Sequence, residues 1–264
     1  MQNISSMLNG LKRDGYVICP TLLDEEQLSE LHDSVLTIGQ TNHPGHVLES
    51  HGQSYRAFHG CHLYDSAFDR LVRLPMLLDF AKSVLGEDVY IHQLKVNMKQ
   101  AFSGEAWPWH QDYIYWQRED AIPTSNILSV MIFLDDIVEF NGPLYFIPRS
   151  HKEGCINVSK TNSLSKGWED NVSASLTYQV SSDIVERLVS EGGLVSATGK
   201  RGTVVWFDAN IVHASPPNMS PFQRRMIIVT YNALSNAPLA QSNQMQRPDF
   251  LNGRNRSALQ TISE

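Results

Sequence analysis

The chain contains the motif Trp109-His110-Gln111-Asp112, and a further histidine, His213, follows 103 positions after His110. Side chains two positions apart on an extended segment point to the same side of the backbone. His110 and Asp112 can therefore bind one edge of a metal ion, and the distant histidine can complete one face of it. A face of two histidines and one carboxylate leaves three adjacent coordination positions open. The motif predicts a fold that holds two distant segments side by side.

The motif is also compatible with a zinc site, or with no metal site at all. Zinc accepts histidine and carboxylate ligands, but its usual catalytic spacings place two ligands close together on a helix. A histidine and an aspartate two positions apart also occur by chance, for example as a surface pair on a loop. An earlier group of histidines has no spacing typical of a zinc site. This group comprises His43, His46, His51, His59 and His62.

The length and composition are those of a globular protein with a sizeable core. The chain has 264 residues, of which 42% are hydrophobic and 19% charged, and we expect one domain spanning residues 1–264. A net charge of −7 argues against nucleic acid or an anionic membrane as a partner. No apolar run reaches the roughly 18 residues that span a bilayer, and the first residues lack the order of a signal peptide. We therefore expect a cytoplasmic protein, monomeric or homodimeric, that acts on a small molecule.

Hydrophobic periodicity and turn residues predict a mainly β fold with flanking helices. Strands are expected at residues 16–19, 89–99, 127–134, 144–148, 194–198, 203–207 and 225–232. Helices are expected at residues 4–14, from Asp24, at 66–85 with a break near Pro75, and at 181–191. Loops are expected at residues 39–62, 117–125 and 157–180, and the first of them is expected to form a lid. The last twenty or so residues are expected to be poorly ordered. Many short strands between turns indicate a jelly-roll sandwich.

Four segments of the sequence resemble the phytanoyl-CoA dioxygenase family. They are WHQDYIYW from residue 109, NGPLYFIPRSHKEG from residue 141, GTVVWFDANIVHASPPN from residue 202, and Arg224. The likeness covers roughly residues 88–235 and is greatest to the ectoine hydroxylase group. It implies a double-stranded β-helix, which is a cupin-like jelly-roll core, and an enzyme that uses Fe(II), 2-oxoglutarate and O2. The iron ligands it implies are His110, Asp112 and His213.

The resemblance also implies that Arg224, eleven positions after His213, binds 2-oxoglutarate. A planar guanidinium suits the distal carboxylate of this molecule because it can donate two parallel hydrogen bonds. Arg225 is the neighbouring alternative, and strand alternation directs only one of the two inward. We expect Arg224 to be the inward residue.

Further pocket residues follow from strand alternation and from the resemblance. Alternation along residues 89–99 places Gln93 and Asn97 on one face, where the ectoine hydroxylase group also has a glutamine and an asparagine. Polar residues on a half-exposed strand usually face water, which is the alternative for both. The resemblance assigns Asn97, Ser129 and Ser215 to 2-oxoglutarate, and Gln93 and Trp116 to the substrate.

The chain departs from the ectoine hydroxylase signature at two places. Gln111 stands where that group has a serine, and Glu119-Asp120-Ala121 stands where it has an acidic run ending in glycine. These departures concern the substrate and leave the implied chemistry unchanged. We expect a hydroxylase acting on an unactivated C–H bond of a free amino acid or amino-acid derivative. Arginines at three positions are candidates to receive such a zwitterion, namely Arg56, Arg118 and Arg149.

Two classes of alternative function are compatible with the same scaffold. One is a metal-binding jelly-roll protein without catalytic turnover. The other is a dioxygenase that performs desaturation, cyclisation or halogenation. Halogenation needs a coordination position freed for chloride, usually by a small residue in place of Asp112, so this carboxylate argues against it.

Overall fold

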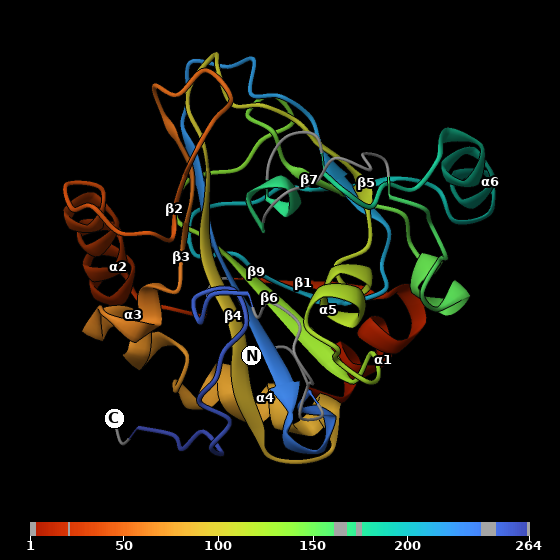
Figure 1. Ribbon diagram of the computed structural model, residues 1–264, viewed down its shortest axis with the longest axis horizontal. Coiled ribbons are helices and arrows are strands. Elements are labelled where there is room, and N and C mark those ends of the chain that lie inside the picture. The colour runs from red at the N-terminus through yellow and green to blue at the C-terminus, as the bar shows by residue number, and fades with distance from the viewer. Residues whose placement is uncertain (1–3, 21, 161–167, 173–175, 239–246, 263–264) are drawn as a thin grey trace.

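The computed structural model describes residues 4–20, 22–160, 168–172, 176–238 and 247–262. Its strands form two antiparallel sheets that face each other (Figure 1). The larger has the order β1 (Tyr16–Cys19), β9 (Val204–Asp208), β6 (Ile127–Phe133), β11 (Arg224–Ala233), β4 (Val89–Lys99), β3 (Tyr55–His59), β2 (His46–Leu48). The smaller has the order β5 (Trp107–His110), β10 (His213–Ser215), β7 (Leu144–Phe146), β8 (Val195–Ala197). This architecture confirms the predicted jelly-roll fold.

The alternation of side chains along the central strands separates two hydrophobic cores. On β6, Met131 and Phe133 point toward the smaller sheet and pack with Phe146 of β7. Val130 and Ile132 point the other way and join a larger core on the outer face. A strand whose two faces are both covered has a continuous apolar sequence, which explains the unbroken hydrophobic run of β6. The space between the sheets therefore holds both a core and the site described below.

Four helices from the first third of the chain cover the outer face of the larger sheet. They are α1 (Ile4–Asp14), α2 (Glu25–Ile38), α3 (Ser66–Leu71) and α4 (Pro75–Leu85). The predicted start of α2 is confirmed, since Asp24 and Gln27 form a capping box. Pro75 occupies the first turn of α4 and separates it from α3, as the break in the helical pattern indicated. Two further helices, α5 (Tyr113–Glu119) and α6 (Ser182–Gly192), follow β5 and precede β8.

Two of the expected loops are wrong in part. Residues 39–62 contain the hairpin of β2 and β3 and the short 3-10 helix η1 (Cys61–Leu63), and β3 pairs with β4. A strand inside the larger sheet argues against the predicted lid, because it is a fixed wall. The expected loop at 117–125 begins inside α5, whose apolar residues precede that range. Of the third loop, residues 161–167 and 173–175 lie outside the described residues.

The C-terminal stretch is ordered where the structure describes it, at residues 247–262, although it forms neither helix nor strand. Leu251 and Leu259 are buried, and the Gly253 and Leu259 amides donate to carbonyls of β4. Polar composition indicated disorder, but a few apolar side chains and backbone hydrogen bonds to a strand are sufficient to fix the segment.

Candidate functional site

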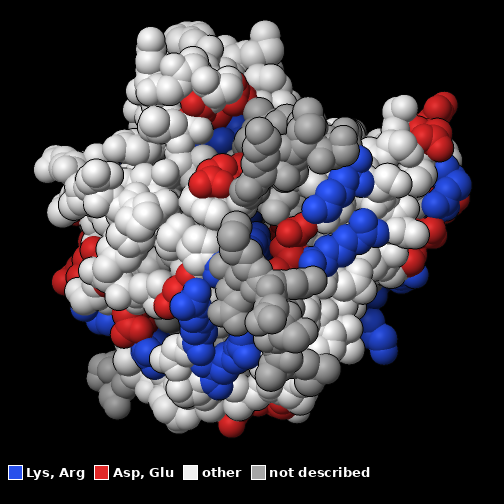
Figure 2. Space-filling model, viewed as in Figure 1, with Lys and Arg blue, Asp and Glu red and all other residues white. Residues whose placement is uncertain are grey.

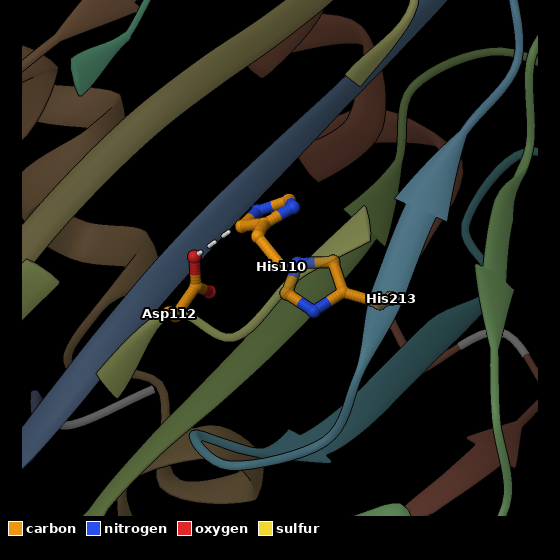
Figure 3. A group of neighbouring side chains, drawn as sticks. All are labelled: His110, Asp112 and His213. Atoms are coloured by element: carbon orange, nitrogen blue, oxygen red, sulfur yellow. Dashed lines mark ion pairs between the residues drawn. The ribbon is translucent and has the colours of Figure 1, made fainter. Parts of the chain in front are cut away.

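His110, Asp112 and His213 meet between the two sheets (Figure 3). His110 ends β5 and His213 begins β10, and these two residues are direct partners in the antiparallel ladder. Their ring centroids are 4.2 Å apart, and His110 Nε2 lies 3.7 Å from Asp112 Oδ1. One ligand atom from each of the three side chains lies within 4.8 Å of the other two. The predicted metal-binding residues are therefore brought together.

The hydrogen bonds of the two imidazoles suit them for metal binding. His110 Nδ1 lies 2.6 Å from the Pro108 carbonyl and His213 Nδ1 lies 3.0 Å from the Ile211 carbonyl. A carbonyl accepts only from a protonated nitrogen, so each neutral ring carries its proton on Nδ1 and keeps the Nε2 lone pair for a metal. Burial lowers the pKa of His110 to about 3 and also lowers that of His213. Both rings are thus neutral and ready to coordinate at neutral pH.

Asp112 reaches the site by a different route from the one expected. The extended conformation ends at His110, and Asp112 has helical dihedral angles at the start of α5. Its carboxylate makes no capping hydrogen bond to the helix, which leaves it for the metal. Burial raises the pKa of Asp112, but the charge of Lys95 and the proximity of the two imidazoles outweigh burial and lower this pKa overall. The three residues selected by the strand argument thus lie together, although the local conformation at Asp112 differs from the expected one.

Gln111, between the two ligands, points away from the site and fixes the neighbouring segments. Its Nε2 donates to the carbonyls of Gly154 and Asn210, and its Oε1 accepts from the Ile156 amide. This explains the departure from the ectoine hydroxylase signature at position 111 as a structural one.

Two small cavities adjoin the triad, one on each side. The first, which we call the Asn97 pocket, is lined by Lys95, Asn97, Trp107, His110, Leu144, His213, Ala214, Ser215 and Ile228. The second, which we call the Gln93 pocket, is lined by His59, Gln93, Lys95, Trp107, His110, Asp112, Tyr115, Trp116, Asn171, Val172, Leu176 and Arg247. His213 faces only the first and Asp112 only the second, so a bound metal would lie between them.

Arg224 stands behind Asn97 and is fully buried. Its Nη1 donates to Asn97 Oδ1 at 2.7 Å, while Nε and Nη2 have no hydrogen-bond partner among the described residues. Burial lowers the pKa of Arg224 to about 9, so it remains a cation at neutral pH. A buried guanidinium with free donors fits the carboxylate of a bound molecule, because unpaired buried donors are costly. Arg225 points to the opposite face, as strand alternation predicted, and pairs with Asp135 at 2.7 Å.

The other predicted pocket residues are divided between the two sides. Ser215 lines the Asn97 pocket, and its hydroxyl donates to the Gly142 carbonyl. Gln93 and Trp116 line the Gln93 pocket. Ser129 lines neither; its hydroxyl lies 3.1 Å from that of Thr230, which is the ladder partner of Gln93.

Several pocket residues were missed by the sequence analysis. Lys95 lies between Gln93 and Asn97 on the same face and lines both pockets. Strand alternation could have identified it, because it occupies the position between two chosen residues. Trp107, His59 and Arg247 had no such signal, since only the folded chain brings them to the pocket.

The three arginines proposed to receive a zwitterion are engaged elsewhere. Arg56 pairs with buried Glu49 and lies 3.6 Å above the Trp107 ring, which it holds in place. Arg118 donates to Val158 and Asn157, and Arg149 donates to the Glu191 carbonyl. The cations that line the Gln93 pocket are instead Lys95 and Arg247.

Comparison with known proteins agrees with this geometry. Residues 11–226 match the family model described as Phytanoyl-CoA dioxygenase (PhyH). The chain belongs to the phytanoyl-CoA dioxygenase family. Within it, the chain is 39% identical to an L-proline trans-4-hydroxylase of Streptomyces griseoviridis over 241 residues, which cover 90% of this chain and 88% of the relative. It is 33% identical to an ectoine dioxygenase of Bordetella bronchiseptica over 242 residues, which cover 88% of this chain and 76% of the relative.

Solved structures of the same family have the same fold. EctD from S. alaskensis with 2-oxoglutarate and 5-hydroxyectoine superposes with a TM-score of 0.83 at 28% identity, covering 98% of this chain and 86% of that one. EctD with bound Fe gives a TM-score of 0.80 with the same coverage. This phytanoyl-CoA dioxygenase family member is therefore an Fe(II)- and 2-oxoglutarate-dependent hydroxylase that uses O2. The sequence predictions of enzyme class and cofactors are confirmed. The alternative function, a metal-binding protein without catalytic turnover, is excluded.

Proposed function

We propose that this enzyme hydroxylates free L-proline at C4, and that residues 1–264 act as one domain. The observation that carries the proposal is the Gln93 pocket, which combines aromatic walls with a cation that has no ion-pair partner among the described residues. Lys95 makes no ion pair with a described residue, and Trp107, Tyr115 and Trp116 line the same space. An ammonium offers a partner for an amino-acid carboxylate, and aromatic faces suit a small saturated ring.

The relatives support an amino-acid substrate over other small molecules. The relative with 39% identity is an L-proline trans-4-hydroxylase, and the ectoine dioxygenases have 33% identity or less among those compared. Proline and ectoine both fit the class predicted from the sequence, a free amino acid or an amino-acid derivative.

The proposed roles of the site residues follow from their geometry. His110, Asp112 and His213 hold Fe(II), which with 2-oxoglutarate and O2 supplies the oxidation that inserts a hydroxyl group as 2-oxoglutarate becomes succinate and CO2. Arg224, oriented by Asn97, donates to the distal carboxylate of 2-oxoglutarate.

Two serines and two substrate-side residues complete the proposed site. Ser215 borders the 2-oxoglutarate side, and Ser129 supports the pocket through Thr230 rather than by direct contact. Gln93 and Trp116 contact the substrate from the other side of the triad. Gln93 Nε2 donates to the Leu251 carbonyl at 3.1 Å, which leaves its amide oxygen as an acceptor for the substrate nitrogen.

The partners we propose are small molecules only. On the face shown in Figure 2, Lys and Arg side chains are interspersed with Asp and Glu, unlike the basic face of a nucleic-acid-binding protein. No helix of the described residues is long and apolar enough to cross a membrane. We propose a cytoplasmic monomer or homodimer that binds neither nucleic acid nor membrane.

The test is a substrate screen with the purified, Fe(II)-loaded enzyme. The twenty amino acids, common derivatives and ectoine are each supplied with 2-oxoglutarate in air, and succinate and hydroxylated product are measured. We expect L-proline to stimulate succinate release most and to yield 4-hydroxyproline, identified by NMR. Greater turnover of ectoine than of proline would replace this proposal with the second candidate, ectoine hydroxylation.

A further inference from the structure

His59 is a buried histidine that none of the roles above uses. It ends β3 and pairs with Lys95 in the ladder to β4, while its neighbour Phe58 packs in the outer core. Alternation along β3 therefore turns His59 to the interior face that carries Lys95 and Asn97. Its side chain lines the Gln93 pocket together with the metal-binding residues His110 and Asp112.

Both nitrogens of the His59 ring lack a hydrogen-bond partner among the described residues. The ring is almost completely buried, at 1% exposure. The other buried histidines of the described chain each have at least one partner: His92 contacts Asp120, and His110 and His213 contact backbone carbonyls. A buried polar group without a partner is costly, so its retention indicates a partner supplied by a bound molecule.

The charges around His59 indicate the chemistry of that partner. Burial, Lys95 and Arg247 hold the pKa of His59 well below its ordinary value, so the ring is neutral. A neutral imidazole donates one N–H, and two cations beside it create a field that favours an anion. Arg247 directs Nε and Nη2 to Asp120, whereas Lys95 has no ion-pair partner among the described residues. Lys95 and His59 are thus donors from paired positions on neighbouring strands that line the same pocket.

We infer that His59 is a substrate-binding residue whose ring N–H, together with the Lys95 ammonium, holds the carboxylate of the amino-acid substrate. Two donors on neighbouring strands can each take one carboxylate oxygen. This fixes the substrate at its acidic end and turns the opposite end of the molecule toward the metal face formed by His110 and Asp112. The inference rests on the proposed function and adds the group that recognises the carboxylate.

The first experiment compares KM and kcat of wild type and two variants with L-proline. His59→Leu removes both ring nitrogens, and we expect KM for proline to rise roughly 10- to 100-fold with kcat and KM for 2-oxoglutarate little changed. His46→Leu is the matched control, because His46 lies on the neighbouring strand β2, also has an unpartnered nitrogen, and lines neither pocket. The KM of His46→Leu for proline should stay within about twofold of the wild-type value.

An isosteric pair keeps the inference testable if His59→Leu does not fold. His59→Gln retains an N–H donor, whereas His59→Glu places a negative charge opposite the substrate carboxylate. We expect KM for proline to be at least about 10-fold higher with glutamate than with glutamine, because like charges repel at short range. Equal KM values for the two would overturn the inference.

L-Prolinamide separates the two ends of the substrate, because it keeps the ring nitrogen and lacks the carboxylate. If His59 binds the carboxylate, His59→Leu should change KM for prolinamide by less than about threefold. An equal loss with proline and prolinamide would show that His59 contacts another part of the substrate and would overturn the assignment. A wild-type enzyme that turns over no proline would instead refute the proposed function, a result that the variants do not influence.

Discussion

The Arg224 guanidinium donates from Nη1 to Asn97 Oδ1 at 2.7 Å across β11 and β4, and its two other nitrogens find no partner among the described residues. Asn97 therefore orients the guanidinium and leaves other N–H groups of Arg224 available as donors. A buried cation with unpaired donors is costly in the protein without ligand, and in the site we propose the carboxylate of 2-oxoglutarate offsets that cost.

Arg224→Ala should raise KM for 2-oxoglutarate far more than KM for the prime substrate. Loss of a charge-assisted bidentate contact costs about 2–4 kcal/mol, or roughly 30- to 1,000-fold in affinity. Arg224→Lys should recover part of this loss, because an ammonium has charge without the fork. Arg225→Ala is the control, because the Arg225 side chain faces Asp135. Its KM for 2-oxoglutarate should stay within about twofold of the wild-type value. A large effect at Arg225 and a small one at Arg224 would contradict the assignment.

Asp112→Ala should abolish hydroxylation and weaken iron binding, because only two histidines would remain on the metal. The fold should persist, since this carboxylate caps no helix. Iron content after desalting, product formation and circular dichroism measure the three effects. Asp33→Ala, on the exposed side of α2, should match wild type in all of them. We expect no halogenation, because removal of a ligand does not build a chloride pocket. Near-normal hydroxylation by Asp112→Ala would exclude this residue as a ligand.

Asp120→Ala should destabilise the protein by about 3–5 kcal/mol, because it leaves Arg247 buried without its anion. Arg247 donates to Asp120 Oδ1 at 2.7 Å, and His92 lies 3.2 Å from the other oxygen. Urea unfolding measures the change. Lys200→Ala breaks a pair at the surface, where Lys200 is 86% exposed, and should cost less than about 1 kcal/mol. Equal losses in the two variants would show that burial of the Asp120 pair is unimportant.

The contribution of Asp120 should depend on pH in a defined direction. Burial raises the pKa of this carboxyl, but Arg247 and His92 outweigh burial and lower the pKa in the folded state. A depressed folded pKa gives stability that is fully present above the unfolded pKa of about 3.9 and is lost as pH falls through the folded value. The stability difference between wild type and Asp120→Ala should therefore be constant from about pH 5 to 7 and shrink below about pH 4. A difference that grows as the pH falls would contradict this sign.

Ala121→Gly should stabilise the protein. Ala121 follows the C-cap of α5 and has a positive φ of 55°, where an L side chain is strained and glycine is not. The relief of about 1–2 kcal/mol exceeds the entropy that glycine gains in the unfolded chain, so we expect a net gain of about 0.5–1 kcal/mol. Ala101→Gly, at a residue without positive φ, should lower the stability. Thermal unfolding compares the two variants, and a loss at both positions would refute the strain.

The amino-acid sequence was sufficient to predict the helices that cover the larger sheet and the strands β1, β4, β6, β7, β8, β9 and β11. It did not predict the β2–β3 hairpin or the short strands β5 and β10, and it indicated the candidate metal-binding residues through their spacing. Apolar runs, alternating or continuous, predict strands such as β4 and β6 because they match strands with one or two covered faces. Asp24 and Pro75 indicate helix starts because an aspartate can cap a helix and a proline fits its first turn. The triad and Arg224 could be proposed from the sequence because fixed spacing within a known family carries information that single residues lack.

The completion of the pocket depends on contacts that exist only in the folded chain. His59, Trp107 and Arg247 reach the site from separate segments, through strand pairing and a buried ion pair that form only when the chain is folded. Arg56 illustrates the converse, since a candidate substrate cation is neutralised by buried Glu49. A charged side chain can be neutralised by another residue of the protein or remain available to a ligand. The outcome depends on distances between residues far apart in sequence, and no local pattern encodes those distances.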